Sequence, residues 1–378
     1  MPTRTPSFLT ALVVPLLAAC TPHDDTDTDT DAETDTAIEV TPSLSFVDVF
    51  QPVDLTPDGH LALLQQVNAT GDFYFYDTES KSLDLMGQVG DASVAAVTGL
   101  SADGAVTGFY ESGTIQAGVW TQAGGWETLA NSTFATGCDA NVSSGWDITA
   151  DGATVVGMLW DTCRVAAGRW DTASGDGTML ARLGVGMDAE TPGDNRATAV
   201  ADDGSLIGGW ASTALTGRYP ALWHADGTGF LVEGLPADQF GEVMGISPDG
   251  TMATGYAGDS AFTWTEASGA VDIGKLPSET DFAPAIGNAI AADNQLVFGV
   301  SGQPFFGSPQ AFVWTAGDNM RPLADVVVQA GLTLPEGYVL TNVLAASVDG
   351  TVVLGQAQDA DFAMWSFVLV LPISAYGL

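Results

Sequence analysis

The chain alternates short apolar runs with tight polar turns, and four such runs recur as a unit. In the best-formed unit, residues 243–247 and 251–255 flank the turn Pro248-Asp249-Gly250. A third run at 261–265 carries a Trp, and a fourth at 271–273 follows a Gly-containing turn. The pattern predicts four short antiparallel strands, which is the composition of one propeller blade.

This unit repeats along the chain. Its Asp-containing turns are Asp58-Gly59, Asp103-Gly104, Asp151-Gly152, Asp203-Gly204, Asp249-Gly250, Asp293-Asn294 and Asp349-Gly350. The third run carries Trp in six units, at Trp120, Trp170, Trp223, Trp264, Trp314 and Trp365. In the first unit Phe73-Tyr74-Phe75-Tyr76 takes this place. A repeat of 41 to 53 residues predicts an all-β protein, a β-propeller of seven four-stranded blades.

Each Asp-Gly pair fits a two-residue hairpin turn in which both central residues have positive φ. Glycine accepts this conformation freely and Asp tolerates it. Asn294 replaces Gly in the sixth turn, and Asn is among the side-chain-bearing residues that adopt positive φ most readily. We therefore predict positive φ at both positions of every turn.

The two ends of the repeat region predict how the ring closes. The last unit lacks an Asp-containing fourth run, whereas residues 46–49 form an apolar run with no turn partner of their own. An unpaired edge strand there would favour aggregation. We expect the N-terminal strand to complete the C-terminal blade.

The recurrent Trp side chains are expected to fill the gaps between adjacent blades. A large aromatic at one position of every repeat is better explained by core packing than by ligand binding. Four Trp residues fall outside this register and are predicted to lie nearer the surface: Trp126, Trp146, Trp160 and Trp210. Of these, Trp146 also fits a buried strand.

The N-terminus predicts export. Arg4 precedes a mostly apolar segment at 8–17, too short to span a bilayer, and Leu17-Ala18-Ala19-Cys20 follows. This arrangement resembles the signal of bacterial lipoproteins, which implies cleavage after residue 19 and a lipid on Cys20. The alternative is an ordinary signal peptide. Thr21 provides no Asp for inner-membrane retention, so the resemblance favours the outer membrane or cell surface.

An acidic segment follows the predicted lipidation site. Residues 24–36 consist mostly of Asp and Thr, and such a composition buries too little apolar surface to fold. We expect three regions: a signal peptide at 1–19, a disordered tether at 20–42 and the propeller at 43–378. A calcium-binding Asp repeat is the alternative for the tether, but the segment lacks the Gly of a tight ion-binding loop.

The chain is strongly acidic. It has 9 Lys and Arg against 47 Asp and Glu, for a formal charge of −38. Removing residues 1–19 removes only Arg4 and no acidic residue, so the charge becomes −39. Such a surface repels nucleic acid and anionic lipids and favours solubility, cations or basic partners. We expect a monomer that does not bind nucleic acid and whose membrane anchor is the lipid.

Two cysteines remain besides Cys20, namely Cys138 and Cys163. An even pair in an exported chain predicts a disulfide. The bond would close a loop of about 25 residues and stabilise the fold by about 3 kcal/mol. Free thiols are one alternative. A metal site is another, but no His lies near either Cys.

Several units resemble the HAF family of bacterial extracellular repeats. The matching segments are Gly245-Ile246-Ser247-Pro248-Asp249-Gly250, Ala261-Phe262-Thr263-Trp264 and Ala311-Phe312-Val313-Trp314. Residues 320–355 also look like the closing segment of that family. The resemblance covers about residues 95–370 and implies an exported β-propeller with no defined activity.

Motifs for catalysis or cofactor binding are missing from the sequence. It contains no His-Glu-x-x-His, no Gly-x-Ser-x-Gly and no phosphate-binding Gly-rich loop with Lys. His224 follows a strand Trp and is expected at the surface. We assign no catalytic, metal or cofactor residue. Four carboxylates lie in one stretch of the chain and would form a calcium or substrate site if their side chains converge: Asp147, Asp161, Asp171 and Asp202.

Two functions remain. The first is a surface-tethered, non-enzymatic lipoprotein whose propeller loops bind a protein or glycan. The second is a carbohydrate-active or other hydrolytic propeller with carboxylates on its axis. The shortage of catalytic motifs favours the first. Two facing carboxylates beside an aromatic ring in a central pocket would favour the second.

Overall fold

Contacts within the chain divide it into residues 1–38 and 39–378. The second unit is described here from a computed structural model. The described residues are 40–48, 50–66, 72–86, 93–111, 114–130, 142–277, 284–302, 309–317 and 319–378.

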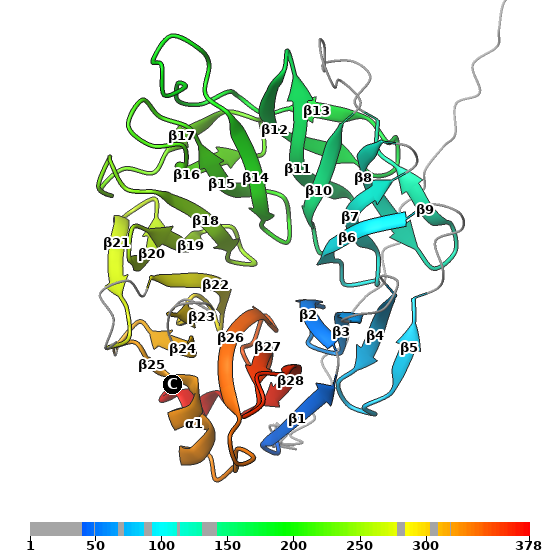
Figure 1. Ribbon diagram of the computed structural model, residues 1–378, viewed down its shortest axis with the longest axis vertical. Coiled ribbons are helices and arrows are strands. Elements are labelled where there is room, and N and C mark those ends of the chain that lie inside the picture. Colours follow the sequence, from blue (N-terminus) through cyan, green and yellow to red (C-terminus); the bar gives the residue numbers. More distant parts are fainter. Residues whose placement is uncertain are drawn as a thin grey trace, which may run out of the picture. The chain divides into compact units, whose positions relative to one another are not determined.

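Seven four-stranded antiparallel sheets form a ring (Figure 1). The first strands of the blades contact one another around the axis and are β2 (Phe50–Leu55), β6 (Ser93–Leu100), β10 (Ser143–Ile148), β14 (Asn195–Val200), β18 (Gly241–Ile246), β22 (Ala285–Ala291) and β26 (Val339–Ala346). The second strands are β3 (Leu61–Gln66), β7 (Val106–Glu111), β11 (Thr154–Asp161), β15 (Leu206–Ala211), β19 (Met252–Ala257), β23 (Leu296–Ser301) and β27 (Val352–Gln358). The third strands are β4 (Phe73–Asp77), β8 (Ile115–Thr121), β12 (Arg164–Asp171), β16 (Tyr219–His224), β20 (Ser260–Thr265), β24 (Gln310–Thr315) and β28 (Met364–Val370). The outermost strands are β5 (Leu83–Leu85), β9 (Gly125–Thr128), β13 (Gly177–Met179), β17 (Gly229–Leu231), β21 (Gly269–Gly274), β25 (Arg321–Pro322) and β1 (Ser43–Asp48).

The N-terminal strand completes the seventh blade, which confirms the predicted closure. β1 pairs with β28 in antiparallel register from Ser43↔Val370 to Asp48↔Trp365. Val47 is 7% exposed, and the Phe46 ring lies 4.9 Å from that of Tyr338. The last blade therefore contains the first strand of the propeller. Pairing between the two ends of the propeller sequence closes the ring.

The Asp-containing turns differ from the prediction in their backbone. Only the second residue has positive φ in six of the seven turns, as at Gly250 (φ 67°). After β18, the Ser247 hydroxyl donates to Asp249 Oδ1 (2.6 Å), which also accepts the Thr251 N–H (3.1 Å). These side chains stabilise a wider turn, so Asp has no need of positive φ. Residues 292–294 all have positive φ, and this turn alone matches the expectation.

The turns also bond to one another around the axis. The residue before each Asp donates its N–H to the matching carbonyl of the next blade, in the pairs Ala102→Ala150, Ala150→Asp202, Asp202→Pro248, Ala292→Val348 and Val348→Pro57. The two remaining links would start at Pro57 and Pro248, which have no N–H to donate. Backbone hydrogen bonds thus join neighbouring blades at this end of the ring.

The recurrent Trp residues pack between blades, as predicted. Trp170 and Trp223 are fully buried. Their Nε1 atoms donate to carbonyls in the chain segment that leaves the preceding blade, at Ala130 (3.2 Å) and Ala181 (2.8 Å). The prediction that Trp365 occupies the same place was wrong: it pairs with Ala357 near the start of β28, Leu369 takes the repeated position, and Trp365 is half-buried. At Trp170 and Trp223, aromatic side chains thus fill the gap between adjacent sheets, and the single polar atom of each is hydrogen-bonded.

The described residues include two short helices that were not predicted. α1 (Leu323–Gln329) begins after Pro322 and buries Leu323, Val326 and Val327, which lie three and four residues apart on one helical face. η1 (Ile373–Tyr376) follows β28. In the described part of the chain, no helix is long and apolar enough to cross a membrane.

Candidate functional site

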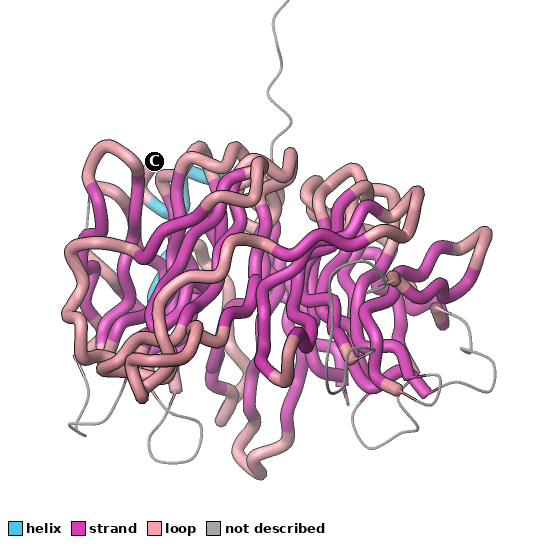
Figure 2. The backbone as a smooth tube through the Cα atoms, turned by 90° about the horizontal axis from the view of Figure 1, so that it is seen from above, coloured by secondary structure: helices cyan, strands magenta, loops and turns pink. Residues whose placement is uncertain are grey.

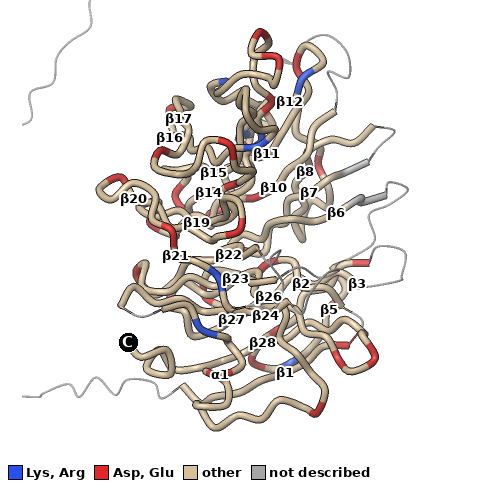
Figure 3. The backbone as a smooth tube through the Cα atoms, turned by 60° about the vertical axis from the view of Figure 1, so that its left-hand side comes forward, with Lys and Arg blue, Asp and Glu red and all other residues tan. Residues whose placement is uncertain are grey.

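The ring has two faces. We call the end that carries the seven Asp-containing turns the turn face, and the opposite end, where the first strand of each blade begins, the loop face. Strands run between these faces (Figure 2). Acidic residues occur in loops and turns around the ring, whereas basic residues are few (Figure 3). Five of the nine basic residues lie between positions 164 and 218.

A β-bulge interrupts the first strand of every blade at the same level. The additional residue of each bulge lines a cavity of about 200 Å³. These residues are Val53, Thr98, Trp146, Thr198, Met244, Asn288 and Leu344. Because all seven blades contribute to its wall, the cavity lies on the axis of the ring. A bulge changes the direction in which a side chain points. Here the bulges determine which side chains line the axial cavity.

Two carboxylates follow these bulges and connect neighbouring blades. Asp54 Oδ2 accepts the N–H of Leu100 in the second blade, and Asp147 Oδ2 accepts the N–H of Val200 in the fourth, each at 2.7 Å. The Oδ1 atom of each carboxylate accepts the N–H of the residue that follows it, at 2.8 Å. All four oxygens are therefore engaged by backbone donors. The arrangement holds the innermost strands together.

Burial changes the protonation of these groups. Loss of solvent raises the pKa of Asp54 to about 7, despite the two backbone hydrogen bonds that oppose the shift. Burial also raises the pKa of Asp147 well above its ordinary value, and the neighbouring Asp54 charge adds to the effect. The pKa of Asp202, which also lines the cavity, is raised by burial and by Asp203. The axis thus holds carboxyl groups that resist ionisation.

We predict that Asp54→Asn makes stability less sensitive to pH. The folded protein retains a proton on Asp54 that the unfolded chain releases above its ordinary pKa of 3.8. Stability from this group is therefore present at low pH and is lost as pH rises towards about 7. Urea unfolding between about pH 5 and pH 8 should show a shallower decline for Asp54→Asn, by up to about 1 kcal/mol per pH unit.

Asp171→Asn is the matched control for this prediction. The pKa of Asp171 is lowered by the backbone N–H and hydroxyl of Ser174, so its titration lies below the measured range. The control should retain the slope of the wild-type protein. Equal slopes for wild-type protein and Asp54→Asn would contradict the account.

A cluster of arginine and aromatic side chains lies at the loop face, where it is formed by the fourth and fifth blades. We call it the arginine–aromatic cluster, and its members are Arg196, Arg218, Glu242, Trp210, Phe240 and Tyr256. Glu242 is buried, with Arg196 Nη2 at 2.6 Å and Arg218 Nη1 at 3.4 Å. The Thr198 hydroxyl also donates to Glu242. Arg196 lies 3.8 Å over the Trp146 ring, which connects the cluster to the axial cavity.

Trp210 belongs to this cluster, and the prediction that it lies near the surface was wrong. It is 8% exposed. Trp210 pairs with Arg196 in the β14–β15 ladder, and the Arg218 guanidinium lies 5.0 Å from its ring. Two arginines cover the indole, so the side chain is buried without occupying the third-strand position that the repeat indicated.

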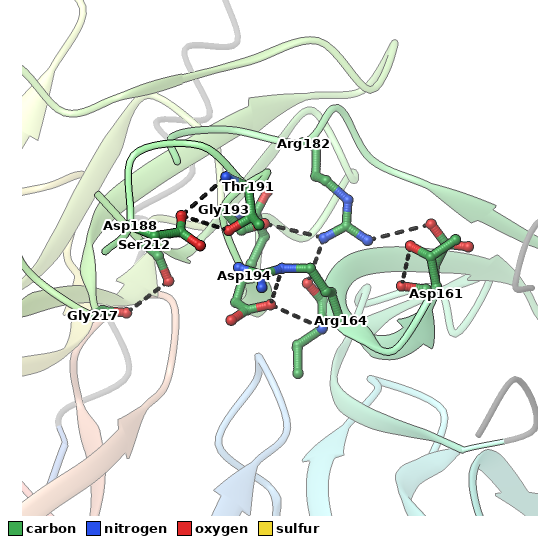
Figure 4. A network of polar contacts seen from close by, with 12 residues as sticks. Asp161, Arg164, Arg182, Asp188, Thr191, Gly193, Asp194, Ser212 and Gly217 are labelled. Carbon is green, nitrogen blue, oxygen red and sulfur yellow. Dashed lines mark hydrogen bonds and ion pairs between the residues drawn. The ribbon is translucent and has the colours of Figure 1, made fainter. Parts of the chain in front are cut away.

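A second polar network on the loop face fastens the connection between β13 and β14 (Figure 4). Arg182 Nη1 donates to the Gly193 carbonyl (3.1 Å), and its Nη2 lies 3.4 Å from Asp161 Oδ2. Arg164 Nε lies 3.3 Å from Asp194 Oδ1. These arginines bind groups of the protein itself, so they support the loop.

The structure does not bring together the four carboxylates that were considered as a calcium or substrate site. Asp147 and Asp202 line the axial cavity, but Asp161 pairs with Arg182 on the loop face and Asp171 accepts the Ser174 N–H in the turn after β12. Within the described ranges, no group of three or more His, Cys, Asp or Glu side chains could hold a metal ion.

The other predicted residues are placed as follows. Exposed His224 ends β16, as expected. Cys163 lies in the tight turn between β11 and β12 with φ 67°. Cys20 and Cys138 lie outside the described residues, so lipidation and the Cys138–Cys163 disulfide remain predictions.

Comparisons with known proteins define the fold. No protein-family model and no curated protein matches the chain. An oligogalacturonate lyase in complex with manganese is similar over 89% of this chain and 92% of its own, with 13% identity and a TM-score of 0.54. The β-propeller domain of Myceliophteria thermophila Cps50 (Swd1) shares 10% identity over 87% of this chain and 100% of its own, with a TM-score of 0.54. An oligogalacturonate lyase from Vibrio parahaemolyticus shares 11% identity over 89% and 98%, with a TM-score of 0.54. The protein is a seven-bladed β-propeller, and identities this low show the fold alone.

Proposed function

We propose that the protein is an exported, surface-tethered binding protein whose propeller recognises a partner through its loop face. The arginine–aromatic cluster is the observation that carries this proposal. It gathers two of the few basic side chains of a strongly acidic chain beside three aromatic rings, and Arg218 remains 36% exposed. Arginine and aromatic residues are the side chains that contribute most often to binding hot spots.

The hydrogen bonds of the axial carboxylates support a structural role for these groups. A general acid or nucleophile needs an oxygen that is directed at substrate. In Asp54 and Asp147, each oxygen instead accepts a backbone N–H, and one of each pair comes from the neighbouring blade. Replacing these residues should lower the stability of the ring more than it lowers the affinity for the partner.

A carbohydrate-active or hydrolytic propeller is the second candidate. It is favoured by the raised pKa of Asp54 and Asp147, because a carboxyl that titrates near neutral pH suits general acid catalysis. Trp146 lines the same cavity and supplies the adjacent aromatic ring. The similarity to two oligogalacturonate lyases extends to the fold alone. The engaged oxygens make this candidate weaker than the first.

Location and partners follow from the sequence features. A lipid on Cys20 would anchor the chain to a bacterial membrane, with the outer membrane or cell surface favoured, and the acidic segment would hold the propeller away from it. The charge of −38 keeps nucleic acid from the surface. The HAF-like motifs support an exported β-propeller, and we propose that it is a monomer that binds a protein or glycan.

The test is a screen of the purified full chain against glycans and cell-envelope extracts, with product formation followed in the same samples. We expect retention of a glycan or envelope protein without turnover. A new reducing end or unsaturated sugar that disappears in Asp147→Asn would instead establish the hydrolytic or lytic candidate. If the purified chain retains no glycan and no envelope protein, the proposal is wrong.

A further inference from the structure

Arg218 is the member of the arginine–aromatic cluster that can reach a ligand. Its guanidinium lies 5.0 Å from the Trp210 ring and 5.4 Å from the Phe240 ring. Arg218 is 36% exposed and Phe240 is 48% exposed, so a cation and an aromatic ring face solvent together. Aromatic faces bind the apolar faces of sugars, and a guanidinium forms a planar fork for a carboxylate.

The charges of the cluster leave Arg218 under-neutralised. Among the described residues, Glu242 is the single carboxylate within 4.0 Å of either arginine, and the charged groups that act on the nearby Tyr256 are these same three. Arg196 takes the shorter contact with Glu242, at 2.6 Å against 3.4 Å for Arg218. One positive charge therefore remains at the exposed side of the cluster, in a chain that is otherwise negative.

Backbone hydrogen bonds fix the chain at the two residues whose side chains are exposed. The Arg218 carbonyl accepts the Gly241 N–H (3.2 Å), and the Phe240 carbonyl accepts the Gly258 N–H (2.8 Å). A Cβ on Gly241 would lie 2.4 Å from the Tyr256 carbonyl oxygen, so this close approach requires glycine. The backbone on both sides of the site is thus fixed before any ligand arrives, which lowers the entropy cost of binding.

We propose that Arg218 and Phe240 form a binding site for a glycan that contains uronic acid. This inference rests on the proposed binding function and adds the class of ligand. The sugar carboxylate would bind the Arg218 guanidinium, and the adjacent pyranose face would pack on Phe240. Arg196 and Glu242 would support Arg218 from below without contacting the sugar.

The test compares two hexasaccharides that differ only at carbon six. A hexamer of β-1,4-linked glucuronate carries six carboxylates, whereas cellohexaose has the same linkage and none. Calorimetric titration of the full chain should show binding of the glucuronate hexamer and weak or no binding of cellohexaose. Arg218→Ala should weaken the former about tenfold or more, because a charge-assisted bidentate contact is lost.

Three further variants separate the site from general effects of charge and folding. Phe240→Ala should weaken glucuronate binding, and Arg218→Lys should retain part of it, because the charge remains without the planar fork. Arg169→Ala removes one positive charge at the far end of β12, where the side chain contacts the Ala225 carbonyl, and should bind like the wild-type protein. Unchanged thermal midpoints show that the variants are folded.

Each other outcome overturns the inference. Equal binding of both hexamers would show that the carboxylate is not recognised. Wild-type affinity in Arg218→Ala and Phe240→Ala would place binding elsewhere, and Arg218-dependent binding of polyglutamate in place of the glucuronate hexamer would identify an acidic protein segment as ligand. If envelope material is retained but the glucuronate hexamer is not, this inference fails and the proposed function stands. If nothing is retained, the proposed function fails.

Discussion

Deletion of residues 43–48 is expected to lower the thermal midpoint of the propeller by roughly 5 to 10 °C. The deletion removes β1, so β28 becomes an exposed edge and the ring is no longer closed by its first strand. It also exposes apolar surface now covered by Leu44, Phe46 and Val47. Together these losses should cost about 4 kcal/mol, and calorimetry of the full and shortened chains measures the effect.

Asp48→Ala is the control for this deletion. Asp48 lies in the same strand and is exposed, so its replacement should leave the midpoint nearly unchanged. An unaltered midpoint in the shortened chain would show that closure by β1 contributes little to stability. Increased aggregation of the shortened chain is also expected, because an uncovered strand edge pairs with other chains.

Trp223→Ala should destabilise the propeller by about 3 to 5 kcal/mol. Trp223 is fully buried between blades, and its Nε1 donates to the Ala181 carbonyl at 2.8 Å. The substitution leaves a cavity between two sheets and an unpaired carbonyl. Urea unfolding followed by circular dichroism gives the change in free energy.

Trp365→Ala is the comparison, because it changes the same residue type at a different position of a third strand: Trp365 pairs with Ala357, and Leu369 has the position that Trp223 has in its own blade. Trp365 is half-buried, and its Nε1 donates to Asp359, which accepts from an exposed loop. The loss of stability should be clearly smaller than for Trp223→Ala. Equal losses would show that the inter-blade position of the Trp does not determine its contribution.

Local turn chemistry made the fold readable from the sequence. Each blade repeats an Asp before a residue of positive φ, and in five of the seven turns a Ser or Thr two positions earlier donates to that Asp. The apolar runs around these turns therefore predicted strands, and an unpaired N-terminal run predicted closure. Helix α1 was missed because its Val-rich sequence favours strands locally, whereas packing against the sixth and seventh blades favours a helix.

The axial carboxylates had a sequence signal that alignment of the repeats would have shown. Asp54 and Asp147 lie four residues before the turn residues Asp58 and Asp151. The other five repeats have Gly or Ala at this position, namely Gly99, Ala199, Gly245, Ala289 and Ala345. A carboxylate where small residues are usual indicates a specific contact, and the structure shows that contact as a bond to the next blade.

The arginine–aromatic cluster had no comparable signal. Arg196 and Glu242 are 46 residues apart and belong to different blades, and Arg218 lies in a connection whose length varies between repeats. Packing of the fourth blade against the fifth brings these side chains together. The site therefore depends on tertiary packing, which neither motifs nor periodicity encode.

The most direct test of the account is to measure one ligand against three proteins: the wild type, Asp147→Asn and Arg218→Ala. The ligand is the glycan or envelope protein that the screen retains best, and binding and turnover are followed in parallel below the unfolding temperature. We predict that Asp147→Asn binds like the wild type, that Arg218→Ala binds about tenfold or more weakly, and that none of the proteins converts the ligand. Turnover by the wild type that is lost in Asp147→Asn, with full affinity in Arg218→Ala, would contradict it.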